Sequence, residues 1–392
     1  MKTKSILALL LVLCLALGLG ACAKSAPQPA STQQPAQTQQ PAATKTPEAP
    51  AETPEAPAEP AASTEAPAEP AGPETVSFTD DAGRTLELPG KIERIAVTGP
   101  MSQIVVFSLA PELLVGVANA WDPGAEGYFD PRYYNLPVLG QLYGGKGELN
   151  LEVLLAAGPQ LVLDVGEAKK SIAEDLDGLT AQTGIPFVHI DASTGTMAEA
   201  YRRLGGLLGL EERAEELASY CEETWARAEA IMAAVGEDRA KILYLLGEEG
   251  LNVIAAGSYH GEIVDLIGDN LAVLDEPSSK GTGNETDMEQ ILLWDPDFII
   301  FANGSVADRV GDDPVWQQLR AIREGHYAEA PFGPFNWMGF PPSVQRYLGI
   351  LWSLKLLYPA QADYELRDEV ERYFELFYHC SLTEEQYNTI IG

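Results

Sequence analysis

Residues 76–392 are predicted to form an α/β protein with two lobes, each built on a mostly parallel sheet flanked by helices. Strand-like apolar segments alternate with helical patterns across this region, which is typical of parallel α/β architecture. One helix–strand pattern occurs twice, which indicates two similar lobes. Between the two occurrences lies a segment without proline or glycine, which predicts one long rigid helix joining the lobes.

The first 22 residues are organised like a bacterial lipoprotein signal. Two lysines precede an apolar run from Ile6 to Leu19, and residues 19–22, Leu-Gly-Ala-Cys, have the form of a lipobox. The run is short for a membrane-spanning helix. We therefore expect export, cleavage before Cys22 and lipidation of its thiol. An ordinary secretory signal with a chance cysteine is the alternative.

Residues 23–75 form a low-complexity segment rich in alanine, proline, threonine and glutamate, without any aromatic residue. Such a composition buries too little apolar surface to offset the entropy lost on ordering. We expect a disordered tether that keeps the folded part within about 100–150 Å of the membrane. The protein is thus expected on the outer face of the cytoplasmic membrane or in the periplasm.

The formal net charge of −33 limits the partners of the chain. A surface this acidic argues against charge-driven binding to nucleic acid or to an anionic membrane. It is compatible with a basic partner surface or with a neutral or cationic ligand, and equally with the solubility of an exported protein. We expect a monomer without a nucleic-acid partner.

The sequence offers little support for catalysis. It has four histidines and neither a G-x-S-x-G nor an H-E-x-x-H motif, so an exported hydrolase is the weaker hypothesis. A receptor for bare metal ions would need three or four converging ligands, and histidine is scarce. We expect no enzymatic activity and no cofactor. Cys221 and Cys380 either form one disulfide or remain thiols, and the sequence does not choose.

Continuous apolar segments bounded by turn residues predict the strands. The first lobe is assigned to residues 76–205, the connecting helix to 206–237 with an uninterrupted part at 210–235, and the second lobe to 238–392. The expected strands are 94–99, 113–119, 160–166 and 186–191 in the first lobe, and 241–247, 251–257 and 297–303 in the second.

The repeated pattern reads "NLEVLLAAGPQLVL" at 150–163 and "DMEQILLWDPDFII" at 287–300, and the two copies align without a gap. Asn150 and Asp287 have side chains suited to capping a helix N-terminus, which places Glu152 and Glu289 in the first turn of two helices. Each helix is expected to end before its proline, and a strand follows. The simplest role of each glutamate is to complement the helix dipole, worth about 0.3–1 kcal/mol.

Several stretches together resemble the lipid-anchored substrate-binding proteins of ABC importers for iron–siderophore complexes, haem and cobalamin. They are the two repeats, "VSFTDDAGRTLELPGKIERIAVTG", "RLGGLLGLEERAEELASYCEE", "FNWMGFPPSVQRYLGILWSLKLLYP" and "YFELFYHCSLTEEQ". The resemblance implies two lobes on one rigid helix, a ligand held between them, and delivery to a membrane permease driven by a cytoplasmic ATPase. It also implies that Glu152 and Glu289 dock against arginines of the permease.

Loops at the carboxyl ends of the strands are expected to face the ligand, because ligands of open α/β sheets bind there. These loops are rich in glycine, with aromatic and methionine residues interleaved, as expected for the walls around a large ligand. The candidates are Met101, Trp121, Tyr143, Lys146, Tyr259, His260, Lys280, Trp337, Met338 and Arg346.

The same residues favour some ligands over others. His260 is the candidate to coordinate a metal directly, since it stands in a glycine-flanked loop. The haem-binding branch of the family carries a histidine where this chain has Asn303, and Arg346 is the only arginine among the candidates. We therefore expect an Fe(III) chelate of siderophore type that is neutral or weakly charged. A corrinoid, haem, and molybdate or tungstate are the alternatives; a roomy aromatic cleft would favour a chelate and a tight polar one an oxyanion.

Overall fold

The computed structural model describes residues 75–143 and 148–391. The predicted signal, the lipidation site Cys22, the tether and the candidate ligand residue Lys146 lie outside these residues. Within the described ranges, no helix is both long enough and apolar enough to cross a membrane. Cys221 and Cys380 are free thiols.

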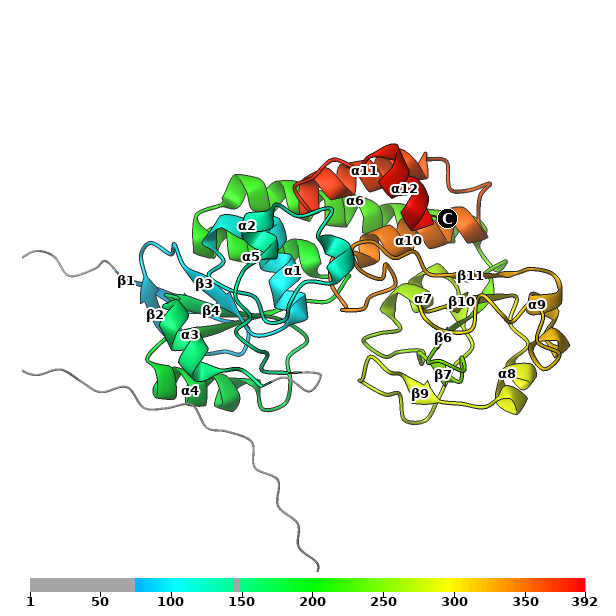
Figure 1. Cartoon of the computed structure of the whole chain (residues 1–392), viewed down its shortest axis with the longest axis horizontal. Helices are drawn as coiled ribbons and strands as arrows, with labels where there is room; N and C mark the ends of the chain where they lie inside the picture. Colours follow the sequence, from blue (N-terminus) through cyan, green and yellow to red (C-terminus); the bar gives the residue numbers. More distant parts are fainter. Residues whose placement is uncertain (1–74, 144–147, 392) are drawn as a thin grey trace, which may run out of the picture. The chain divides into compact units, whose positions relative to one another are not determined.

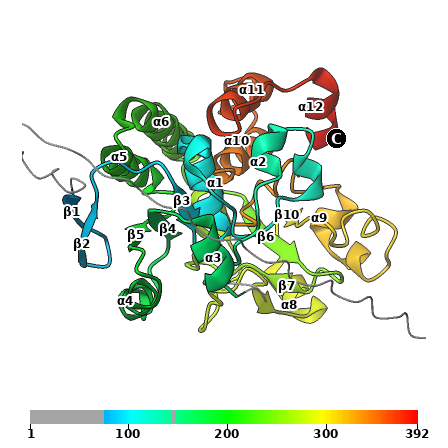
Figure 2. The same cartoon turned by 60° about the vertical axis from the view of Figure 1, so that its left-hand side comes forward.

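The N-terminal lobe contains a two-stranded hairpin and a parallel three-stranded sheet of order β3-β4-β5. Its strands are β1 (Thr75–Thr79), β2 (Thr85–Pro89), β3 (Ile95–Val97), β4 (Leu161–Gly166) and β5 (Phe187–Asp191). Its helices are α1 (Pro100–Leu109), α2 (Pro131–Tyr134), α3 (Leu151–Ala157), α4 (Ile172–Thr183) and α5 (Met197–Leu208). Figures 1 and 2 show α1 and α5 on one face of the sheet and α3 and α4 on the other.

Successive side chains of a strand point to opposite faces of the sheet, which explains the two layers of helices. Leu161 and Leu163 of β4 contribute to the core beneath α1 and α5, whereas Val162 between them contributes to a separate core with Leu154 of α3 and Leu176 of α4. Both faces are buried, so the strands are continuously apolar, as is usual for parallel sheets.

A single long helix, α6 (Glu211–Val235), follows the N-terminal lobe, in agreement with the predicted range 210–235. It packs closely on α5 because Gly205 leaves room: a Cβ there would lie 2.4 Å from the Cβ of Ala214. Helices α10 (Arg346–Leu357) and α11 (Leu366–Phe377) also pack against α6 (Figure 1). One continuous apolar core therefore runs from the N-terminal sheet along α6 to the second lobe.

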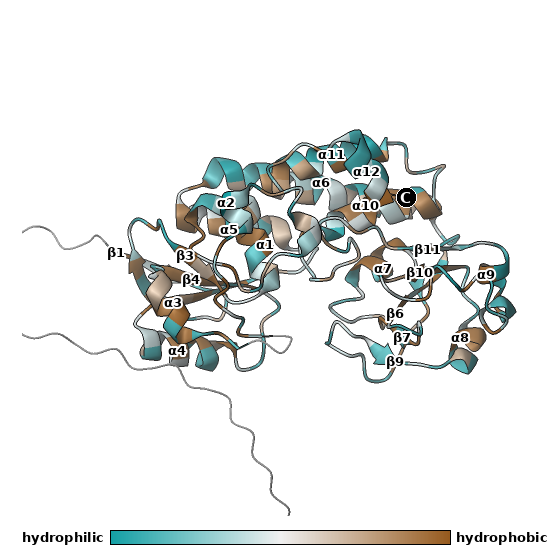
Figure 3. Ribbon diagram, in the orientation of Figure 1, coloured by the Kyte–Doolittle hydropathy of each residue, from teal (hydrophilic) through white to brown (hydrophobic). Residues whose placement is uncertain are grey.

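The C-terminal lobe has a mixed sheet of order β11-β10-β6-β7-β9, with β8 paired to β6. Its strands are β6 (Lys241–Leu246), β7 (Asn252–Val253), β8 (Asp269–Asn270), β9 (Asn284–Glu285), β10 (Phe298–Phe301) and β11 (Tyr327–Glu329). Its other helices are α7 (Glu262–Ile267), α8 (Met288–Trp294), α9 (Arg320–Arg323) and α12 (Glu384–Ile391). Figure 3 shows hydrophilic residues over much of α11 and α12, whereas the strands are largely hydrophobic.

The structure corrects two predicted strands. Segment 113–119 is not a strand: Leu114 bridges to Ile95 and Val117 to Val138, and two partners in different segments cannot form a continuous ladder. Of segment 251–257 only β7 is extended, and it runs antiparallel to β6. The connection between β6 and β7 is a short turn, whereas a parallel pairing requires a crossover of a dozen or more residues.

Candidate ligand-binding site

A cavity of about 800 Å³ lies between the two lobes. The N-terminal lobe contributes the residues that follow β3, the start of α1 and the end of β4. The C-terminal lobe contributes loop residues 259–260, 279–282 and 340–342. The N-terminal wall thus stands at the carboxyl ends of parallel strands, where helices leave room for a ligand.

Asp164, near the end of β4, places a carboxylate in the N-terminal wall. Its Oδ1 accepts a hydrogen bond from Thr98 Oγ1, and its Oδ2 lies 2.7 Å from Nδ1 of the fully buried His189. Both partners sit on neighbouring strands or their ends, so the sheet itself fixes this carboxylate. The sequence interpretation missed Asp164, although one charged residue in an apolar strand was a usable signal.

Met101 and Tyr143 form further parts of the N-terminal wall. Tyr143 Oη donates a hydrogen bond of 2.7 Å to Asp175 Oδ2, and burial together with this bond raises the pKa of Tyr143. Met101 Sδ lies 3.1 Å from Tyr259 Oη of the opposite lobe. The polarizable thioether and the neutral phenol therefore both face the cavity.

Tyr259 and His260 form part of the C-terminal wall of the cavity. Tyr259 Oη also donates to the carbonyl of Ala192, 3.1 Å away, so the phenol joins the lobes. His260 stacks on Phe340, with ring centroids 5.8 Å apart and planes 8° from parallel. Its Nδ1 is buried without a hydrogen-bond partner among the described residues. Burial, aided by the charge of Arg346, lowers the pKa of His260 to about 4, so the imidazole is neutral at neutral pH.

The charges that line the cavity balance. Of the residues that the structure describes, two carboxylates, Asp164 and Glu167, and two ammonium groups, Lys169 and Lys280, line the cavity, and none is an arginine. Glu167 and Lys169 form an ion pair of 2.5 Å. These described side chains supply no excess positive charge with which to hold a strongly anionic ligand.

Five of the ten predicted ligand residues line this cavity: Met101, Tyr143, Tyr259, His260 and Lys280. Trp121 and Trp337 do not. The Trp121 indole lies within a cluster of aromatic rings, 5.2 Å from Phe107, and donates to the carbonyl of Tyr133 at 2.9 Å. Trp337 is fully buried and donates to the carbonyl of Gly333 at 3.1 Å.

Met338 and Arg346 are also placed in the interior. Met338 is buried under α10, with Ser353 Oγ 3.6 Å from its sulfur. Arg346 is only 1% exposed and lies behind Tyr259, with its guanidinium carbon 5.1 Å from the centre of that ring. Helix α10 carries Arg346 and covers Met338, so it supports the cavity wall from behind.

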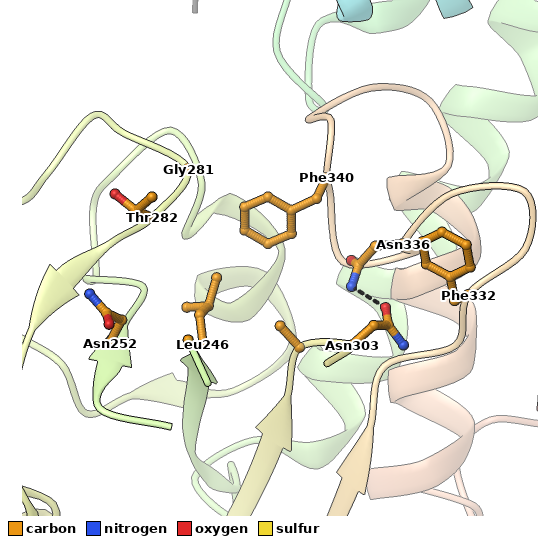
Figure 4. A pocket seen from close by; sticks show the side chains of 10 residues that line it. Leu246, Asn252, Gly281, Thr282, Asn303, Phe332, Asn336 and Phe340 are labelled. Carbon is orange, nitrogen blue, oxygen red and sulfur yellow. Dashed lines mark hydrogen bonds between the residues drawn. The ribbon is translucent and has the colours of Figure 1, made fainter. Parts of the chain in front are cut away.

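A second cavity of about 460 Å³ adjoins the first within the C-terminal lobe (Figure 4). Gly281, Thr282 and Phe340 line both cavities, so the ring of Phe340 stands at their boundary. The remaining lining residues come from the ends of β6 and β10, from β7 and from the segment after Phe332. We call this second cavity the side chamber.

The repeated helices α3 and α8 have the predicted caps. Asn150 accepts a hydrogen bond from the Val153 amide at 3.1 Å, and Asp287 accepts one from the Gln290 amide at 2.8 Å. Glu152 and Glu289 each stand in the first turn and are exposed. Among the described residues, neither glutamate has an ion-pair partner.

Comparison with known proteins agrees with this architecture. The family model for periplasmic binding proteins matches residues 105–333. The comparison with curated proteins gives no match.

Solved structures match over most of the chain. An ABC-transporter solute-binding protein from Sulfurospirillum deleyianum is 28% identical with a TM-score of 0.73, over 80% of this chain and 98% of that one. A periplasmic solute-binding protein from Veillonella parvula is 25% identical with a TM-score of 0.65, over 81% and 97%. The molybdate-binding MolA of Haemophilus influenzae is 20% identical with a TM-score of 0.62, over 79% and 99%, which shows the fold alone.

Two α/β lobes, a long helix between them, a cavity at the lobe boundary and a family match across both lobes lead to one assignment. The chain belongs to the periplasmic binding protein family, whose members are the extracytoplasmic solute-binding proteins of ABC transporters and not enzymes.

Proposed function

We propose that the protein captures a neutral or weakly charged Fe(III) chelate of siderophore type and delivers it to an ABC permease. The observation that carries this proposal is the cavity of about 800 Å³, which has aromatic and methionine walls and balanced charges. That volume suits a ligand of several hundred daltons, since sites for such molecules span roughly 300–1,000 Å³.

The shape and chemistry of the cavity weigh against the smaller and the more anionic alternatives. A molybdate or tungstate ion would need a tight shell of donors, and this cavity is roomy and partly aromatic. For a strongly anionic chelate the cavity lacks arginine, because Arg346 is turned to Glu262. Asn303 replaces the histidine of haem-binding members, and its amide is bonded to Asn336 and Glu329. A corrinoid remains the second candidate, since it too is large and carries little charge.

His260 is the residue we assign to direct contact with the metal of the chelate. Its ring lines the cavity, and it is neutral at neutral pH. A neutral imidazole nitrogen is a common metal ligand. No cluster of three or more histidine, cysteine or carboxylate residues occurs in the described ranges, so His260 would complete a coordination sphere supplied mainly by the chelator.

We further propose that Glu152 and Glu289 dock the two lobes onto arginines of the permease, and that a lipid on Cys22 holds the protein at the membrane. Exposed apolar side chains accompany each glutamate: Val153 and Leu155 on α3, and Leu293 on α8. Apolar contact around a charged anchor is the usual composition of a protein interface.

A panel of ligands with different charge tests the proposed specificity. We expect saturable binding of ferrioxamine-type hydroxamate chelates or of cyanocobalamin in isothermal titration calorimetry. Molybdate and ferric tris-catecholate should not bind, since the balanced cavity offers them no excess positive charge. Binding of molybdate, or failure of every neutral or weakly charged compound, would contradict the proposal.

A further inference from the structure

The side chamber differs from the main cavity in its chemistry. Not one of its ten lining residues is ionisable: they are Leu246, Gly247, Asn252, Gly281, Thr282, Ala302, Asn303, Phe332, Asn336 and Phe340. The main cavity, by contrast, contains four charged side chains. We propose that the side chamber is a separate subsite for an uncharged, planar group that bears an amide. If the proposed function is right, this group is an arm of the transported chelate.

Two of the three asparagines in the chamber are fixed by their own hydrogen bonds. Asn336 Nδ2 donates to Asn303 Oδ1 at 2.6 Å, the bond drawn in Figure 4. Asn303 Nδ2 in turn donates to the carbonyl of Ala330 at 2.6 Å, and Asn336 Oδ1 accepts from the Met338 amide at 2.8 Å. These amides form a rigid polar wall whose orientation does not depend on a ligand.

The opposite wall holds the unused hydrogen-bonding capacity. Among the described residues, neither the Asn252 side-chain amide nor the Thr282 hydroxyl has a hydrogen-bond partner, and Figure 4 shows both on the side facing Phe340 and Asn336. Asn252 offers both donors and an acceptor. A ligand group that both donates and accepts, such as a carboxamide, can pair with one N–H and the carbonyl oxygen of this side chain at the same time.

The rest of the lining is apolar and favours a planar ligand group. Phe332 and Phe340 contribute aromatic rings, and Leu246 and Ala302 line the chamber at the ends of β6 and β10. None of the ten lining side chains carries a charge that would compensate an ion for its lost hydration, and the nearby Glu329 carboxylate already accepts from Asn303 Nδ2 at 3.0 Å. A neutral amide would exchange one set of hydrogen bonds for another. The chamber should therefore discriminate by charge among groups of the same shape.

Gly281 keeps the two cavities connected. A Cβ at this position would lie 3.2 Å from Cε1 of Phe340 and 3.4 Å from Cε1 of His260. Any larger side chain would narrow the passage between the side chamber and His260. A single ligand can therefore contact His260 with one part and the side chamber with another.

Benzamide, benzoate and benzamidinium test the inference, because they share a shape and differ in charge. Each is titrated into isotope-labelled protein while the side-chain amide signals of Asn252, Asn303 and Asn336 are followed by NMR. We expect benzamide to shift these signals and to bind at least about tenfold more tightly than either ion, given the cost of burying an unpaired charge. Equal binding of the three, or no shift of these signals by benzamide, overturns the proposal.

Two variants locate the effect within the chamber. Asn252→Asp and Thr282→Asp should each reverse the preference towards benzamidinium. Thr282 lies in an exposed loop, so its substitution should not disturb folding. The exposed Asn388→Asp, which adds the same charge outside the chamber, should keep the preference for benzamide. An unchanged order in both chamber variants contradicts the proposal. These probes contain no metal, so the result is independent of whether the protein binds an iron chelate.

Discussion

Replacing both Glu152 and Glu289 by alanine is expected to remove most transport while folding and ligand affinity stay nearly intact. Both side chains are exposed, and neither has an ion-pair partner among the described residues. The caps of their helices are made by Asn150 and Asp287, which the variant keeps. The carboxylates thus contribute little to stability, and their proposed value is electrostatic recognition of a basic permease surface.

Uptake of a radiolabelled chelate into proteoliposomes containing the permease and its ATPase measures the effect. Each single substitution should give a partial loss. Glu174 and Glu199 supply a matched control, because both are exposed glutamates in the first turn of a helix, and their double alanine variant should transport normally. Normal transport by the Glu152/Glu289 variant would exclude docking through these residues. Loss of ligand affinity instead would place the glutamates in the binding site.

Removing the guanidinium of Arg346 is expected to destabilise the protein by about 3–5 kcal/mol, the usual cost of breaking a buried ion pair. Arg346 is 1% exposed, and burial lowers its pKa. Its Nη1 donates to Glu262 Oε2 and to Thr194 Oγ1, both at 3.2 Å, and its Nη2 donates to the carbonyl of Tyr259 at 3.1 Å. Without this cation the partly buried Glu262 carboxylate loses its counter-charge.

The same carboxylate joins the two lobes. Glu262, at the start of α7, accepts hydrogen bonds from the backbone amides of Thr194 and Gly195, each at 2.9 Å. Tyr347 Oη donates to the carbonyl of Thr194 at 2.6 Å. Arg346 and Glu262 therefore act as an inter-lobe clamp beside α6, which opposes separation of the lobes at this side of the cavity.

Urea unfolding of Arg346→Met, Glu262→Gln and the double variant measures the clamp. Each single change should lower the free energy of unfolding strongly, and the double variant should lose less than the sum, because neither charge is then left unpaired. Arg367→Met is the control, since Arg367 forms an exposed ion pair with Glu371 and should contribute little. Additive losses would contradict a direct Arg346–Glu262 interaction.

The features that the sequence predicted well are encoded by neighbouring residues. Helix α6 runs almost as expected because strong helix formers are uninterrupted from Glu211 to Val235. The caps at Asn150 and Asp287 follow from side chains that bond to an amide three residues away. Such signals need no knowledge of the tertiary structure.

Selection of the residues that face the cavity depends on distant contacts, and there the sequence was a weaker guide. Trp121 and Trp337 stand in the expected loops, yet both rings are buried. Trp121 packs among aromatic rings, and each indole N–H donates to a backbone carbonyl in the interior. Arg346 is drawn away from the cavity by Glu262, a residue 84 positions earlier in the chain. Asp164 lies within β4, whose other residues have the apolar pattern of a buried core strand, so the sequence interpretation did not assign it to the cavity.

Native mass spectrometry of protein purified from its own host tests the central claim most directly, namely that the inter-lobe cavity holds a metal chelate. Gly99→Trp should block that cavity: Gly99 lines it, has an extended backbone with φ of −167°, and leaves open space where a Cβ would stand. Gly206→Trp, at an exposed position of α5 with equally open space, is the control. The account predicts an added mass with the isotope pattern of an iron or cobalt complex on the wild type and on Gly206→Trp, and none on Gly99→Trp. An oxyanion mass, or a chelate that stays bound to Gly99→Trp, would contradict it.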